Sequence, residues 1–325
     1  MKFLFPKQLK KGNLLMPERK ALQVISVGHL CVDHIYSCEE YPPENASRHI
    51  LGFSSHAGGT AAQAAVTLAR LGVSAGYMGS FGDDETGSFL YQDCLAEGLD
   101  LSRCKRYPGV LHSFTNVIVS QRRNSRTFFS YHGAFPPMEF TKEDVAYLSQ
   151  ARILHLDNTR SDDALAAALI ARQHGVLVSL DGSSLSPDHQ KNWELVRMTD
   201  ILITSETFPS RLTGNPDRRQ ALLEIERAVH PQILISTGGE TGCLAVVSGK
   251  TEAFPAYSIH PVDTTGAGDV FHGAFLYGLL NGYALSENIR FASAAAAISC
   301  RASGGRDGIP RLEEIRRFIA ERSFP

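Results

Sequence analysis

Short apolar runs rich in valine and isoleucine alternate along the chain with longer segments whose apolar residues recur at helical spacing. The short runs are predicted to be buried strands, at residues 24–27, 153–156, 176–180, 201–204 and 233–236. The longer segments are predicted to be helices, at residues 59–71, 86–97, 141–150, 162–174 and 217–229. Strands that alternate with helices of this length favour right-handed βαβ units. The sequence therefore predicts an α/β fold whose mostly parallel sheet is covered by helices on both faces.

Two regions, residues 36–55 and 114–131, show alternating apolar and polar positions instead of continuous apolar runs. The second predicts a hairpin, FTNVIVS followed by RTFFSY, around a polar turn at residues 122–125. Half-exposed strands of this kind need not join the buried sheet, so we expect them to form a small separate sheet. A further hairpin, CLAVV–SGK–TEAF, precedes a glycine-rich run at 263–273. No internal repeat or low-complexity linker divides the sequence into independent domains.

The composition is that of an ordinary globular enzyme, with 43% hydrophobic and 20% charged residues among 325. The formal net charge of -2 gives no basic field that would recruit nucleic acid or an anionic membrane. The six cysteines are scattered without a C-x-x-C pair, which favours reduced thiols over a disulfide framework. No apolar run approaches the roughly 20 residues that span a bilayer. These features predict a soluble, cytoplasmic protein.

The first twenty residues differ from the rest in charge. They hold a single acid, Glu18, and a polar interruption at residues 8–13 breaks the apolar stretch that a secretory signal needs. The favoured interpretation is a disordered basic tail, or an upstream start preceding Met16. The alternative is a weak contact with a membrane surface or a partner. We expect residues 21–325 to form one domain.

The glycine-rich run DTTGAGDVFHG lies where a predicted extended segment, 257–262, leads into an apolar helix, 270–280. Glycines at 266 and 268 allow a tight turn, and the unpaired N–H groups of a helix start form an anion site. A carboxylate beside a bound anion is unfavourable unless it takes a proton or a metal assists. Asp269 fits a base that removes the proton of an attacking hydroxyl. The alternative is a helix cap worth roughly 0.3–1 kcal/mol, without any chemistry.

Other nucleotide-binding motifs are missing from the sequence. It has no G-x-x-x-x-G-K-[ST] motif, since Gly249-Lys250-Thr251 lacks the leading glycine and falls inside a predicted hairpin. It also has no G-x-G-x-x-G motif, so a dinucleotide-dependent oxidoreductase loses its main support.

Two long motifs resemble those of the ribokinase/PfkB family of carbohydrate and nucleoside kinases. The first is D-T-x-G-A-G-D-x-F at 263–271, and the second is HAGGTAAQAAVTLARLG at 56–72, followed by MGSFGDDETG. The resemblance covers about residues 22–320 in the right order, and the closing CRASGGRDGIP resembles sugar-kinase members such as sulfofructose and ketohexose kinases. It implies a ribokinase-like three-layer α/β/α fold with a small β-sheet lid, here built from about 34–56 and 110–133. It also implies ATP, Mg²⁺, a sugar substrate and a homodimer formed through the lid.

The resemblance implies a role for individual residues. Asp269 matches the catalytic base, and residues Gly266, Ala267 and Gly268 match the anion hole for the transferred phosphoryl group. Asp33, Gly58 and Gly59 match the residues that hold the sugar. The nucleotide-binding loop after a strand is matched by Thr237, Gly239 and Gly242, and Ala295 belongs to a segment that would flank adenine. Asp263 and Thr265 match positions that bind a monovalent cation, usually potassium.

Several positions depart from the family pattern or lie outside its motifs. Gln63 stands where the family commonly has asparagine, which keeps the amide but lengthens its reach. The N-x-x-E motif falls on residues 205–208, where Ser205 replaces the asparagine and the final glutamate is missing. Glu206 is then a candidate for the outer shell of Mg²⁺, or a solvated strand-end charge. Arg160 and Arg126 are candidates for binding a negative group on the substrate, or are solvated charges. His29 is a candidate donor to a sugar oxygen, although a structural histidine is the favoured interpretation, and His272 is interpreted as packing.

The function predicted from these observations is ATP-dependent phosphorylation of a hydroxyl on a sugar or sugar derivative. Within the family, the alternative is a nucleoside kinase, which needs an aromatic or apolar pocket for the base. From a different class, the alternative is a nucleotide-binding regulatory protein with little turnover. The degraded N-x-x-E motif supports that second alternative, and the intact G-A-G-D sequence opposes it.

Overall fold

The computed structural model describes residues 22–123 and 125–322 of the chain. The expected basic tail therefore lies outside the described residues. Within them, no helix combines the length and the apolar character that crossing a membrane requires.

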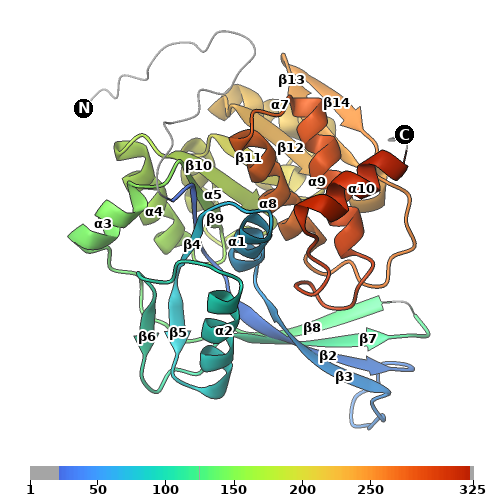
Figure 1. Cartoon of the computed structure of the whole chain (residues 1–325). Helices are drawn as coiled ribbons and strands as arrows, with labels where there is room; N and C mark the ends of the chain where they lie inside the picture. Colours follow the sequence, from blue (N-terminus) through green and yellow to red (C-terminus); the bar gives the residue numbers. More distant parts are fainter. Residues whose placement is uncertain (1–21, 124, 323–325) are drawn as a thin grey trace.

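A central sheet of eight strands confirms the predicted α/β fold (Figure 1). In this sheet the six strands β4, β1, β9, β10, β11 and β12 run parallel to their neighbours, whereas β13 and β14 form an antiparallel hairpin at one edge. The five predicted strands occupy its middle, while β4, with sequence AGYM, lacks the β-branched residues that would have predicted it. In spatial order the strands are β14 (Lys250–Phe254), β13 (Cys243–Val247), β12 (Ile233–Thr237), β11 (Ile201–Thr204), β10 (Leu177–Gly182), β9 (Ile153–Asp157), β1 (Val24–Val27) and β4 (Ala75–Met78).

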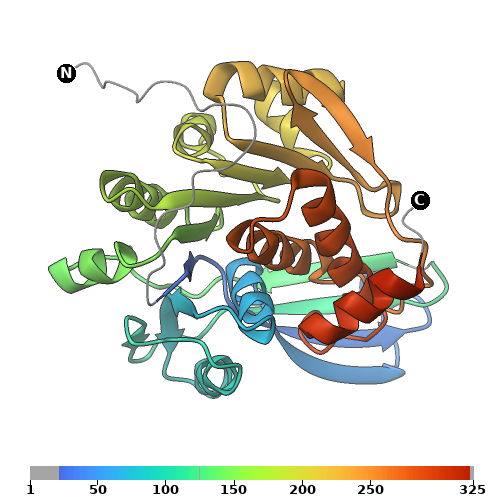
Figure 2. The ribbon, with the colours of Figure 1, turned by 45° about the horizontal axis from the view of Figure 1, so that its top comes forward.

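Helices cover both faces of this sheet, which gives three layers (Figure 2). Successive strand residues point to opposite faces, so Val24 joins one apolar core and Ile25 joins the other. The first core includes residues of α1 (Thr60–Arg70), α2 (Glu85–Ala96), α8 (Ala267–Leu280), α9 (Leu285–Ser299) and α10 (Leu312–Glu321). The second includes residues of α3 (Lys142–Leu148), α4 (Ser161–Gln173), α5 (His189–Arg197), α6 (Phe208–Thr213) and α7 (Arg218–Val229).

A separate four-stranded sheet projects from one side of the three-layer body (Figure 1). We call it the lid sheet. Its strands come from two segments far apart in the sequence, in the order β3 (Gly52–Gly58), β2 (Cys31–Cys38), β7 (Phe114–Ser120) and β8 (Ser125–Tyr131). The alternating apolar pattern of these segments thus corresponds to strands that lie outside the buried sheet. A small third sheet pairs β5 (Ser80–Gly82) with β6 (Lys105–Tyr107).

The two faces of the lid sheet differ in chemistry. The register places Asp33, His56, Thr115 and Ser130 side by side across the strands, and therefore on one face. The other face carries rings that pack together in pairs, His34 with Phe53, Tyr36 with Phe53 and Phe114 with Tyr131. The polar face is the one whose side chains meet the catalytic loops described below.

Candidate active site

The start of α8 forms an anion site at the edge of the central sheet. Gly266 is the residue just before the helix, and its φ is 75°, a left-handed conformation that favours glycine. The chain turns at this residue and then enters the helix. The backbone N–H groups of Gly268 and Asp269 donate no hydrogen bond within the described part of the chain. A β-carbon at residue 268 would meet nothing within 4 Å, so the helix start faces open space. Free N–H groups at the positive end of a helix dipole are suited to bind a phosphoryl group.

Asp269 lies in the first turn of this helix, beside the free N–H groups. Burial, followed by the negative charges of Asp181, Asp157 and Asp33, raises the pKa of Asp269 well above its ordinary value. A carboxylate with a raised pKa binds a proton more strongly than a solvated one. The position and the electrostatics of Asp269 are both those of a proton acceptor next to an anion site.

Asp33 belongs to β2 of the lid sheet, at the edge of the segment predicted for the lid, 34–56. Burial raises the pKa of Asp33 to about 6, against the opposing hydrogen bond from Cys31 and the charge of His56. Gly58 of β3 lies against this carboxylate, and a β-carbon at residue 58 would overlap an oxygen of Asp33. Gly58 is therefore the residue whose small size lets the Asp33 carboxylate keep its place. The next residue, Gly59, lies against the backbone of residues 29 and 30.

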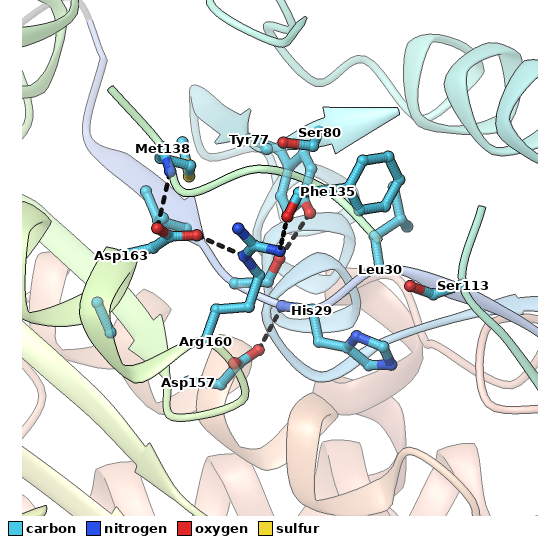
Figure 3. Close-up of a pocket in the computed structure, with 14 residues that line it drawn as sticks. His29, Leu30, Tyr77, Ser80, Ser113, Phe135, Met138, Asp157, Arg160 and Asp163 are labelled. Carbon is cyan, nitrogen blue, oxygen red and sulfur yellow. Dashed lines mark hydrogen bonds and ion pairs between the residues drawn. The ribbon is translucent and has the colours of Figure 1, made fainter. Parts of the chain in front are cut away.

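Asp157, which the sequence reasoning missed, holds the loop after β1 against the start of α1. It ends β9, is 1% exposed, and accepts hydrogen bonds from the backbone N–H of His29 at 2.6 Å and of Ala61 at 3.3 Å (Figure 3). A carboxylate at the end of a buried parallel strand was the available signal. The pKa of His29 is lowered from its ordinary value, mainly by burial. The centroid of its ring lies 5.5 Å from that of His132.

Gln63 is buried in α1 and connects the helix to the loop after α9. Its Oε1 accepts a hydrogen bond from Nε of Arg306 at 2.8 Å. Its Nε2 lies near residues 266 and 305, 3.3 Å from the position of a β-carbon at 266. Arg306, which is 2% exposed, also forms an ion pair with Asp93. The longer amide of Gln63 thus reaches the anion-hole segment, and its arginine partner was not predicted from the sequence.

The predicted nucleotide loop follows β12 as a tight turn. Thr237 ends the strand and donates its hydroxyl to the carbonyl of Thr204 at 3.2 Å. A short 3₁₀ helix, η1 (Gly239–Thr241), follows, and the N–H of Gly238 donates to the carbonyl of Gly242 at 2.7 Å. Gly242 has φ 83°, and a β-carbon there would overlap the carbonyl of Phe254. Gly242 therefore lets the loop backbone pass close to the end of β14.

Arg218, at the start of α7, joins this loop to the degenerate N-x-x-E segment. Its guanidinium donates to the carbonyl of Ser236 at 2.5 Å and to the Ser236 hydroxyl at 3.0 Å. It also forms an ion pair of 3.2 Å with Glu206, whose side chain is 59% exposed. Ser205 donates its hydroxyl to the carbonyl of Gly182 at 3.4 Å. The sequence reasoning singled out Glu206 and missed the arginine that binds it, because the two are distant along the chain.

Asp263 and Thr265 form a compact turn just before the anion hole. The Asp263 carboxylate accepts hydrogen bonds from the N–H of Thr265 at 2.9 Å, from the Thr265 hydroxyl at 2.7 Å and from the N–H of Gly304 at 3.1 Å. Arg126 of the lid sheet reaches the same carboxylate at 3.1 Å. The segment 257–262 that leads into this turn contains no strand, although we expected extended backbone there.

Arg160 lies beside the loop between β1 and β2, in a small pocket that His29 and Tyr77 also line (Figure 3). Its guanidinium forms an ion pair with Asp163 and donates to the carbonyls of Phe135 at 3.2 Å and Pro136 at 2.6 Å. These bonds fix the segment after the lid sheet. The structure therefore gives Arg160 intramolecular partners and does not bring it to Asp33 or Asp269.

Two predicted positions lie beneath the surface. Ala295 is fully buried in the core of α9, because its small side chain lets this helix pack closely on α8. His272 is 4% exposed, and its Nε2 lies 3.2 Å from Asp181. Burial lowers the pKa of His272 to about 3, which favours the neutral ring beside Asp181. Burial also raises the pKa of Asp181 to about 6.

Comparisons with known proteins agree with this geometry. Residues 21–312 match the pfkB family carbohydrate kinase. A 5-dehydro-2-deoxygluconokinase of Geobacillus thermodenitrificans is 28% identical over 94% of this chain and 96% of its own. A putative ribokinase from Agrobacterium tumefaciens superimposes with a TM-score of 0.83 at 26% identity, covering 93% of this chain and 99% of its own. The fold is also that of Arabidopsis thaliana ribokinase complexed with ribose and ATP, with a TM-score of 0.81 at 23% identity, over 92% and 98% of the two chains.

Proposed function

The chain belongs to the pfkB family of carbohydrate kinases, which transfer phosphate from ATP to a sugar hydroxyl, and we propose that Asp269 is the base of this reaction. One observation carries the proposal. Asp269, with its raised pKa, shares the first turn of α8 with backbone N–H groups that have no partner in the described part of the chain. A proton acceptor and an anion site are thus held within one helical turn.

The unpartnered N–H groups of Gly268 and Asp269 support the anion-hole role, whereas the N–H of Ala267 donates to the carbonyl of Thr264 at 3.3 Å. Phosphoryl transfer passes through a loose transition state, so catalysis consists mainly of positioning the reactants and neutralising charge. The N terminus of α8 supplies fixed donors and a positive dipole end, which need no rearrangement during the reaction. Asp269 then receives the proton as the bond to phosphorus forms.

We assign the sugar to the polar face of the lid sheet. Asp33 offers a carboxylate to hydroxyl donors, and Gly58 and Gly59 allow close approach of the backbone beside it. Gln63 connects this region to the anion-hole segment. A lid that covers the sugar excludes water and so suppresses wasteful hydrolysis of ATP.

We assign ATP to the edge formed by the ends of β11 and β12. Thr237, Gly239 and Gly242 provide the loop, and Ser205 lies at the end of the neighbouring strand. Arg218 supplies a positive charge next to this loop. Because a planar guanidinium suits phosphate, we expect Arg218 to strengthen nucleotide binding.

Mg²⁺ accompanies ATP in such reactions, and two side chains here fit it. Among residues 22–123 and 125–322, no three His, Cys, Asp or Glu side chains gather as a metal site. Mg²⁺, however, is usually held by one or two carboxylates together with substrate phosphates. Asp181 has an oxygen, Oδ1, that is buried without a hydrogen-bond partner, and Glu206 follows the adjacent strand. When bound, the ion would neutralise charge on the phosphates.

The face of the lid sheet that carries the paired aromatic rings, opposite Asp33, supports a homodimer. Phe53 and Phe129 are 58% and 53% exposed, and the register places them on the face opposite Asp33. Exposed aromatic groups clustered on one face are typical of protein interfaces.

All six cysteines are free, and five are buried, which supports a reducing, cytoplasmic location.

The function is tested by ADP release from the purified protein with a panel of sugars, sugar acids and nucleosides. The names of the relatives point to different substrates, so the panel includes ribose and 5-dehydro-2-deoxygluconate. Nucleosides belong in it because Phe128, 55% exposed, shares the polar face with Ser130 and could stack on a base. The Asp269→Asn variant, purified identically, measures any contaminating kinase.

We expect turnover with at least one sugar or sugar acid, and none above background for the variant. Turnover confined to nucleosides would replace the sugar assignment by a nucleoside kinase. ATP binding without turnover on any acceptor would favour a regulatory protein.

A further inference from the structure

Arg126 connects the lid sheet to the segment that leads into the anion hole. Its Nη1 donates to Asp263 at 3.1 Å and to the Thr265 hydroxyl at 2.6 Å, and its Nη2 donates to the Thr264 hydroxyl at 2.7 Å. One guanidinium from the lid thus binds three consecutive residues, 263–265. Gly266 and the start of α8 follow directly.

The Asp263 carboxylate already binds four donors. Oδ1 accepts from the N–H of Thr265, the Thr265 hydroxyl and Arg126, while Oδ2 accepts from the N–H of Gly304. An ionised carboxylate has about two lone-pair sites on each oxygen, so Oδ1 is fully used and Oδ2 keeps one site. The Asp263 side chain is only 16% exposed, so the group is enclosed by its partners.

This arrangement disagrees with a monovalent cation at Asp263 and Thr265. A cation needs free oxygen atoms, whereas Oδ1 of Asp263 is fully used and the Thr265 hydroxyl already accepts from Arg126 and donates to Asp263. A second positive charge placed beside the guanidinium would also be repelled. The residues present therefore fit an arginine and not an added ion.

We propose that the guanidinium of Arg126 takes the place of the monovalent cation at Asp263 and Thr265, so that lid closure fixes the anion-hole segment without potassium. The inference rests on the proposed function, since it assigns Arg126 as a positioning residue for that reaction. It predicts an enzyme that does not depend on potassium and whose catalytic loop is ordered by the lid.

A second contact on the opposite edge of the lid sheet supports this coupling. His56 of β3 lies 3.1 Å from Asp307, in the loop after α9. The lid order is β3-β2-β7-β8, so His56 and Arg126 belong to its two outer strands. The loops that they contact are joined to each other by the hydrogen bond from Gly304 to Asp263. The lid is thus tied at both edges to one connected pair of catalytic loops.

The first experiment measures thermal unfolding of the wild type and Arg126→Ala without sugar or ATP. Each is compared in KCl, NaCl and tetramethylammonium chloride at about 0.1 M, where ionic screening is equal. We expect no potassium-specific shift of Tm for the wild type, and a potassium-specific rise for Arg126→Ala because the vacated oxygens can bind an ion. The proposal is overturned if the wild type shows the potassium-specific rise, or if neither protein does.

The second experiment measures steady-state kinetics in the same salts with the active sugar. We expect potassium to change wild-type kcat by less than about twofold, and Arg126→Gln to lower kcat at least about tenfold with a smaller effect on the KM for ATP. Arg126→Lys should retain more activity than Arg126→Gln, and millimolar guanidinium should restore part of the activity of Arg126→Ala. Strong activation of the wild type by potassium, or failure of guanidinium to restore activity, contradicts the proposal.

A matched control removes a different arginine from the same lid. Arg122 lies in the turn between β7 and β8, where it pairs with Glu40 at 3.0 Å and its side chain is 67% exposed. Arg122→Gln should keep both the wild-type kcat and the wild-type response to salts, and a kcat loss equal to that of Arg126→Gln would overturn the proposal by showing a general effect of lid charge. If no acceptor supports turnover, the proposed function fails, while the unfolding experiment still decides the role of Arg126.

Discussion

The two halves of the cleft hold their ligands with different chemistry. The acceptor half holds two carboxylates whose pKa values are raised by burial, those of Asp33 and Asp269. The nucleotide half consists of the backbone turn at 237–242 and the cationic side chain of Arg218. Carboxylates repel phosphate, so in the acceptor half only the N–H groups of α8 can receive the phosphoryl group. The difference separates the residues that act on the hydroxyl from those that hold ATP.

Among substitutions that leave the base in place, the largest effect in the acceptor half is expected from Gly58→Ala. The new β-carbon would overlap the Asp33 carboxylate and displace it from the sugar. Misplacement by about 1 Å can cost roughly a hundredfold in rate, so we expect kcat/KM for the sugar to fall by about that factor. The affinity for ATP, measured by calorimetry, should remain unchanged.

Gly52→Ala is the matched control, because it lies in the same strand and its β-carbon would meet no atom closer than 3.8 Å. It should keep wild-type kinetics. Equal losses in the two variants would mean that β3 tolerates no added methyl group, and Asp33 would lose its support as the sugar ligand.

In the nucleotide half, Arg218→Gln should raise the KM for ATP about tenfold, which corresponds to about 1.4 kcal/mol of lost binding. The KM for the sugar should stay the same, since Arg218 contacts only Ser236 and Glu206 at that edge. Arg219→Gln is the control, because this exposed neighbour donates to Thr251 in the β14 hairpin. A change in sugar KM with Arg218→Gln would contradict the division of the cleft.

The pH dependence of sugar binding tests Asp33 alone. Since burial raises the pKa of Asp33 to about 6, its carboxylate is ionised above that pH and protonated below it. We expect the KM for the sugar to rise as the pH falls below about 6, because the protonated group accepts hydroxyl hydrogen bonds poorly. Asp33→Asn should show a high KM without this dependence. A wild-type KM that stays flat through this range would exclude Asp33 as an ionised ligand.

The smallest expected effect is that of Asp269→Asn on stability. This substitution should raise stability, although it lowers activity. A carboxyl group whose pKa is raised in the folded state contributes a penalty that is absent below the unfolded pKa and grows as the pH rises. Asp269→Asn removes this penalty. We expect its Tm at pH 8 to exceed that of the wild type by roughly 1–2 °C, the shift expected for about 1 kcal/mol in a domain of this size. The difference should shrink towards pH 4, and a lower Tm for the variant at pH 8 would contradict it.

The sequence predicted those parts of the molecule that depend on local pattern. The strands at 24–27 and 201–204 match the structure residue for residue, because continuous β-branched runs have few other stable arrangements. The anion hole followed from glycines and an acid within one turn of α8. Both features are encoded by neighbouring residues.

The parts that could not be predicted depend on residues far apart in sequence. Arg126 and Asp263 are separated by 137 positions, and Arg306 and Gln63 by 243. The alanines at 294–297 favour close approach of a helix, and Ala295 is indeed fully buried, but the sequence does not say which residues cover it. Strand β4 was missed because its burial comes from pairing with β1 and not from its own residues. Local pattern therefore located the reacting groups, while the fold determined their partners.

The central claim, that Asp269 takes the proton of the sugar hydroxyl, is tested most directly by rapid-quench measurement of a single turnover. Wild type and Asp269→Asn are each saturated with ATP, Mg²⁺ and the active sugar, with binding of both ligands verified by calorimetry. We expect the transfer step in the variant to slow by about 10³-fold or more while both ligands remain bound, as for the loss of a general base. Transfer in the variant within about tenfold of the wild-type rate would contradict this role for Asp269.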